Sequence, residues 1–131
     1  MVEGQKLPEL VRGPITRDTL SIFAVASHDH LPLHIDSDYA RLAGMDDVIA
    51  HGMLSMAYLG QGLRIWVPQD RIREWRVRFT AITPIHALVH CRGEVADIFD
   101  NNGERRARLR IGTWTHHNVQ TIKGEAIVTL D

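Results

Sequence analysis

The chain has 131 residues, and we expect a single domain over residues 1–131. Hydrophobic residues make up 44% and charged residues 24%, as in an ordinary globular protein, which excludes a disordered or a collagen-like chain. Fifteen Lys and Arg against sixteen Asp and Glu give a net charge of −1. The basic excess of a general nucleic-acid binder is therefore absent.

Cysteine usage and hydropathy exclude two further classes. The one cysteine, Cys91, excludes an internal disulfide and a multi-thiolate zinc site, and we expect it to be a buried, inert thiol. No apolar run approaches the ~20 residues of a membrane span, and the N-terminal residues lack the hydrophobic segment of a signal peptide. We therefore expect a cytoplasmic protein that does not enter a membrane.

Three helices are predicted in the first half of the chain. Thr16 can cap a helix that continues to about Ser27, and Ser37 can cap a short second helix that Gly44 ends. The third helix, residues 52–66, is apolar nearly all the way round. This pattern is typical of a helix enclosed by protein.

The second half alternates between apolar and polar residues, as strands do. Alternation begins at Ile72, and further strand-like runs cover residues 87–99, 106–111 and 122–130, with a turn signal at residues 101–103. Long strands with short links predict an antiparallel sheet, and an enclosed helix predicts that this sheet wraps around it. The expected fold class is α+β, an antiparallel sheet wrapped around a long central helix, with an edge strand open to a second copy.

The densest group of ionisable side chains lies in residues 28–36, HDHLPLHID. A turn at Pro32 would bring Asp29 and His34 together, and such a pair can hold a water and move its protons. A solvated polar loop is the alternative. A metal site of His28, His30 and His34 with Asp29 is a weaker hypothesis, because the spacing matches no helix-borne zinc pattern, and we expect no metal.

The start of the third helix is the second candidate feature. No Ser, Thr, Asp or Asn stands where a capping residue should be, so the first N–H groups of the helix need another partner. A ligand oxygen with partial negative charge could approach them at Gly52, although water or the His51 side chain could also cap the helix. An acid–base pair beside such an end suits a carbonyl whose oxygen becomes enolate-like.

Three runs, AVASHDHLPLHIDSDYARLAG, VIAHGMLSMAYLG and RVRFTAITP, together resemble the MaoC-like dehydratases, the (R)-specific enoyl-CoA hydratase group of the hot-dog fold. The family motif reads Gly-Asp-any-Asn-Pro-aliphatic-His, followed downstream by Ala-His-Gly-Met. The resemblance covers roughly residues 13–130 and implies that Asp29 and His34 are the catalytic pair. It also implies that the Gly52 N–H holds the thioester oxygen.

The resemblance further implies a hydro-lyase that adds water reversibly to a trans-2-enoyl thioester and forms a (R)-3-hydroxyacyl thioester. The substrate would be an acyl-CoA or an acyl-carrier thioester. Coenzyme A would enter only as part of the substrate, and no other cofactor would be needed. The protein would be a homodimer or a higher homo-oligomer. This sequence departs from the family pattern at His28, where the family has Gly, and at Leu31, where it has Asn. It departs again after Pro84, where Ile85 and His86 replace Gly-Asp.

Two other function classes stay open. A hot-dog thioesterase would use the carboxylate to activate water against the carbonyl carbon, and a non-catalytic partner subunit would contribute only an interface.

Strand arginines could also form a basic stripe that meets coenzyme A phosphates, although a solvated outer sheet face is the commoner explanation for Arg76, Arg78, Arg106, Arg108 and Arg110.

Overall fold

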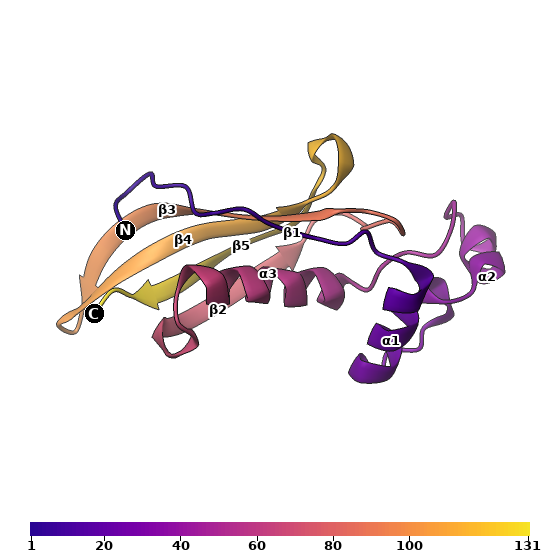
Figure 1. Ribbon diagram of the computed structural model, residues 1–131, viewed down its shortest axis with the longest axis horizontal. Helices are drawn as coiled ribbons and strands as arrows, with labels where there is room; N and C mark the ends of the chain where they lie inside the picture. The colour runs from indigo at the N-terminus through magenta and orange to yellow at the C-terminus, as the bar shows by residue number, and fades with distance from the viewer.

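A computed structural model describes all residues, 1–131. One five-stranded antiparallel sheet has the strand order β1-β3-β4-β5-β2. The long helix α3 lies along one face of this sheet, and α1 and α2 lie beyond one end of it (Figure 1). The elements are β1 (Leu10–Arg12), α1 (Arg17–Ser27), α2 (Ser37–Leu42), α3 (Gly52–Trp66), β2 (Ile72–Phe79), β3 (Val89–Asn101), β4 (Glu104–Trp114) and β5 (Gln120–Thr129).

The central helix α3 has the predicted bounds but not the predicted enclosure. Leu54, Leu59 and Leu63 are buried in the core beneath the sheet, whereas Met53 and Ile65 are 55% and 58% exposed. The expectation of a helix enclosed all round is therefore wrong for this chain by itself, because a single sheet covers one face of a helix. No helix of the protein combines the length and the apolarity that crossing a bilayer requires.

The first two helices begin where side chains satisfy their free N–H groups. Thr16 caps α1 as predicted, its hydroxyl accepting a backbone N–H of the first turn at 3.1 Å. The prediction that Ser37 caps α2 is wrong. Asp36 is the cap, because the Ser37 hydroxyl donates instead to the carboxylate of Asp47 at 2.8 Å.

The predicted strands are confirmed, and one strand was not predicted. Residues 10–12, for which no element was predicted, form β1 and pair with Val89–Cys91 of β3. Asn102 and Gly103 take positive φ angles of 51° and 80°, as a tight hairpin turn requires. Cys91 is fully buried, which confirms the expected burial, and this burial raises the pKa of its thiol to about 12.

Candidate active site

The end of α1 directs the chain into the loop that carries the predicted pair. His28 has φ 56° and ψ 30°, the left-handed conformation, and the N–H of Asp29 donates to the carbonyl of Ala24 at 3.1 Å. This hydrogen-bonded ending usually has glycine at the left-handed position, where another residue costs about 1–2 kcal/mol. His28 therefore adopts the backbone conformation for which glycine is favoured, and the turn forms without it.

A turn at Pro32 then brings the two candidate side chains together. Residues 32–34 form one turn of 3₁₀ helix, and Leu31 before them is extended, with φ −54° and ψ 126°. The Leu31 N–H donates to Asp29 Oδ1 at 3.3 Å, which fixes the carboxylate within the loop. As a result His34 Nε2 lies 3.9 Å from Asp29 Oδ2, which confirms the predicted convergence.

The hydrogen bonds of His34 determine which ring nitrogen is available. Its Nδ1–H donates to the carbonyl of Ile49 at 2.8 Å, because a carbonyl can only accept. The Nε2 atom of the neutral ring then carries a lone pair on the side of Asp29. Its separation from the Asp29 carboxylate is too long for a direct hydrogen bond and suits a bridging water. His34 is 8% exposed, whereas the Asp29 side chain is 50% exposed, so the pair is anchored on one side and open on the other.

His51 is a third member of the site that sequence reasoning did not assign. Its Nε2–H donates to the backbone carbonyl of Asp29 at 3.0 Å, and its ring stacks on that of His34 with centroids 3.9 Å apart. His51 is only 2% exposed, and this burial lowers its pKa, with His34 contributing in the same direction. A neutral ring thus packs beside His34. The alternative in which the His51 side chain caps α3 is wrong, because that side chain bonds Asp29 and no side chain caps the helix.

Beside the pair, the uncapped start of α3 lines a cavity of about 180 Å³. Gly52 is the first residue of α3, and its N–H finds no acceptor within the chain. A Cβ at this position would lie 3.0 Å from Phe79 Cε1, so glycine leaves room between the helix end and the Phe79 ring. Gly52 and His34 thus share one cavity, whose other lining residues are Ile49, Ala50, Ser55, Phe79, Ala81, Ile82, Thr83, Thr121 and Ile122.

One possible ligand set for a metal differs from the one the sequence suggested. Asp29, His34 and His51 each place a donor atom within 4.8 Å of the other two, whereas His28 and His30 are not part of this group. A carboxylate and two imidazoles are also donors that zinc accepts. Here one nitrogen of each ring already donates to a backbone carbonyl, so a single nitrogen of each remains.

Comparisons with known proteins found a family model and a curated relative that match this chain. The family model described as "MaoC like domain" matches residues 2–115. A segment of 61 residues is 36% identical to the fatty acid synthase beta subunit hexB of Dothistroma septosporum and covers 44% of this chain and 3% of that protein. The chain thus spans a small fraction of that relative.

Solved structures share the fold over nearly the whole chain. R-hydratase PhaJ1 of Pseudomonas aeruginosa is 28% identical with a TM-score of 0.84, covering 98% of this chain and 81% of that one. The (R)-hydratase of A. caviae involved in PHA biosynthesis is 24% identical with a TM-score of 0.86, covering 100% and 98%. The ChsH1-ChsH2 complex of Mycobacterium tuberculosis contains a similar chain, 18% identical with a TM-score of 0.83, covering 99% and 98%. The hot-dog fold expected from the sequence is confirmed.

Proposed function

The chain belongs to the MaoC-like domain family, and on this premise we propose that it is a hydratase of acyl thioesters. It would interconvert a trans-2-enoyl thioester and a (R)-3-hydroxyacyl thioester. The observation that carries the proposal is the approach of Asp29 and His34 to 3.9 Å beside the cavity that His34 shares with Gly52. The R-hydratase PhaJ1, at 28% identity, supports the same reaction class.

The reaction needs a water and a thioester held next to each other, the water at Asp29 and His34 and the thioester oxygen at Gly52. Water between Asp29 and His34 loses a proton to one of them, and its oxygen bonds to the β-carbon of the enoyl group. The electrons of the double bond move to the thioester oxygen, which the Gly52 N–H and the positive end of the α3 dipole stabilise. The member of the pair that took the water proton then delivers it to the α-carbon, and the net change is the addition of water.

His51 and Ile49 serve this chemistry as positioning residues. The Ile49 carbonyl accepts from His34 Nδ1–H and so keeps the Nε2 lone pair toward the water. The His51 N–H holds the backbone of Asp29, and its ring holds the plane of His34. Because burial lowers the pKa of His51, the ring beside His34 carries no charge that would compete for the carboxylate.

Turnover of crotonyl-CoA, followed as loss of enoyl absorbance, tests the proposal. We expect Asp29→Asn and His34→Ala each to lower turnover by at least ~10²-fold. Asp46→Asn is the matched control, because it removes the same charge from an exposed loop residue that has no side-chain bond. Near-normal turnover in either site variant would contradict the assigned roles. Release of free thiol would indicate a thioesterase, and no turnover of any acyl thioester would indicate a non-catalytic subunit.

We also infer that the chain self-associates. Large apolar side chains are exposed on the three helices, namely Ile22, Val25, Leu42, Met53 and Ile65. The edge strand β2 additionally has one side without a partner strand. A second copy of the chain would cover these surfaces and enclose the second face of α3. Sedimentation of the protein alone tests this, and a monomer at every concentration would contradict it.

A further inference from the structure

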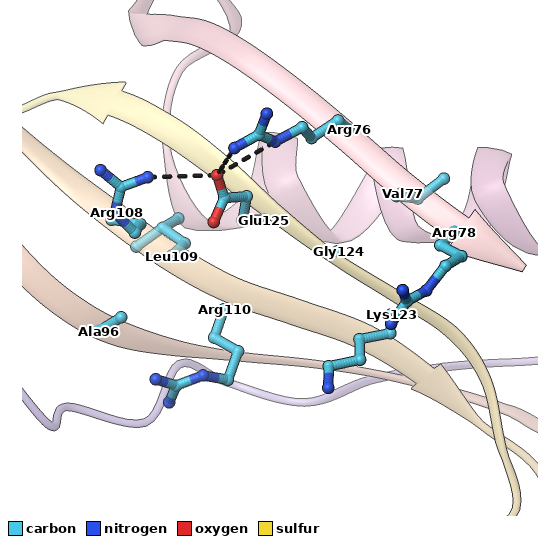
Figure 2. Close-up of a pocket in the computed structure, with 10 residues that line it drawn as sticks. All are labelled: Arg76, Val77, Arg78, Ala96, Arg108, Leu109, Arg110, Lys123, Gly124 and Glu125. Atoms are coloured by element: carbon cyan, nitrogen blue, oxygen red, sulfur yellow. Dashed lines mark hydrogen bonds and ion pairs between the residues drawn. The ribbon is translucent and has the colours of Figure 1, made fainter. Parts of the chain in front are cut away.

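The face of the sheet opposite α3 carries the strand arginines and a second hollow. This hollow has a volume of about 460 Å³ and lies over β2, β5 and β4 (Figure 2). Basic side chains dominate its lining, and Glu125 is the one acidic residue in it. The question is whether the chain itself neutralises these cations.

In one row of residues across the sheet, the positive and negative charges balance. The strand register places Arg76, Glu125, Arg110 and Glu94 side by side on β2, β5, β4 and β3, with alternating charge. Arg76 and Arg108 both donate to the Glu125 carboxylate, as the dashed lines in Figure 2 show. Arg110 completes the row with a longer contact of 3.8 Å to Glu94. Arg76 and Arg108 are thus neutralised by Glu125, whereas the Arg110 guanidinium makes no hydrogen bond to Glu94 at this distance and stays exposed.

In the neighbouring row, the positive charges have no negative counterpart within the row. The register places Arg78, Lys123, Gly112 and Arg92 side by side on the same four strands, and none of them is acidic. Arg92 is paired with Glu9 at 3.0 Å. Arg78 and Lys123 face each other directly, and their side chains have no ion pair or hydrogen bond within the chain, although like charges placed opposite each other destabilise a sheet.

We propose that Arg78 and Lys123, with Arg110 beside them, bind a diphosphate-bearing ligand on this outer face. Figure 2 shows these three side chains without a bond to Glu125, which is held away from them by Arg76 and Arg108. Guanidinium groups bind phosphate oxygens in pairs, and a lysine adds a mobile point charge.

The row lies directly behind one wall of the cavity of the candidate active site. Phe79 follows Arg78 and lines that cavity, and Ile122 precedes Lys123 and lines it too. Because successive residues of a strand point to opposite faces, the same strand segments serve both sites. The diphosphate could belong to coenzyme A of the substrate, which rests on the proposed function, or to a separate phosphate-bearing ligand.

Titration of the full chain with inorganic pyrophosphate, measured by calorimetry at low salt, tests the site directly. The double variant Arg78→Gln/Lys123→Gln should bind at least ~10-fold more weakly than the unmodified protein. The matched control is Arg64→Gln/Arg71→Gln, which removes two exposed arginine charges from outside this row and should leave the affinity unchanged. Absence of pyrophosphate binding in the unmodified protein, or equal weakening in the control, would overturn the proposal.

A second measurement identifies the source of the diphosphate. If it belongs to the substrate, the double variant raises KM for crotonyl-CoA and leaves KM for the crotonyl thioester of pantetheine, which lacks a diphosphate, unchanged. If pyrophosphate binding is lost while both KM values stay constant, the site takes a separate phosphate-bearing ligand. The calorimetry needs no turnover, so a protein that binds pyrophosphate without hydrating crotonyl-CoA would contradict the proposed function and leave this site standing.

Discussion

Replacing Gly52 by proline should remove the N–H assigned to the thioester oxygen while leaving α3 in place. Gly52 is the first residue of α3, where proline is well tolerated because the N–H there has no intrahelical acceptor. The preceding His51 has φ −60° and ψ 132°, already the extended conformation that a residue before proline adopts. The change is therefore confined to the helix end that lines the cavity.

The expected size of the effect follows from the loss of one oxyanion donor. Such a loss costs about 10²–10³ in kcat, equivalent to about 2.7–4 kcal/mol. Proline also brings a Cβ, which would lie 3.0 Å from Phe79 Cε1, so part of any loss could be steric. Gly52→Ala adds the same Cβ and keeps the N–H, and the Phe79 ring is half-exposed and free to shift. The ratio of the two variants therefore removes the effect of the Cβ and reports the loss of the N–H together with the proline Cδ that takes its place.

Crotonyl-CoA hydration measures this ratio, and thermal unfolding of both variants checks that the helix end is intact. We expect the alanine variant to retain most of its turnover and the proline variant to fall below it by at least ~10²-fold. If the two variants agree within about threefold, a difference of less than about 0.7 kcal/mol, the Gly52 N–H does not stabilise the transition state.

Three further predictions test the supporting structure. Burial lowers the pKa of His51 in the folded state below its ordinary 6.5, so the stability of the fold should fall as the pH drops below 6.5. In thermal melts, His51→Phe should flatten this pH dependence. An unchanged pH dependence in the variant would contradict the assignment. Leu59 is fully buried, and Leu59→Ala should lower the free energy of unfolding in urea by about 2–5 kcal/mol, whereas a loss below about 1 kcal/mol would mean that α3 does not anchor the core. His28→Gly should change stability by less than about 1.5 kcal/mol, because relief of the left-handed strain is offset by the flexibility of glycine in the unfolded chain, and turnover should not change.

The main elements could be predicted from the sequence because each has a local cause. Gly52 and Pro68 bracket α3, and the alternation from Ile72 onward reports strands whose two faces differ. The strand β1 could not be predicted, since its three residues carry no alternation and are ordered by pairing with β3. The exposed face of α3 was also missed, because apolar residues such as Met53 and Ile65 lie on sides of the helix that a single sheet does not cover.

The candidate site likewise contains residues that the sequence could predict and one that it could not. The convergence of Asp29 and His34 could be predicted because Pro32 between them ends the helix and favours a turn. His51 could not be assigned, because its role depends on a ring stack and on a carbonyl 22 residues away in the sequence. The one local signal was its place directly before Gly52 at a helix start with no ordinary cap.

The departures from the family motif separate its backbone requirements from its chemical ones. Position 28 must have positive φ, and His28 meets that requirement although glycine does so at lower cost. Position 31 supplies a backbone N–H to the Asp29 carboxylate, a contact that Leu31 makes as well as any residue other than proline. Neither position acts here through its side chain, so their substitution leaves the turn in place. Positions 29 and 34 differ, because only their side-chain atoms reach across the gap in which a water would be activated.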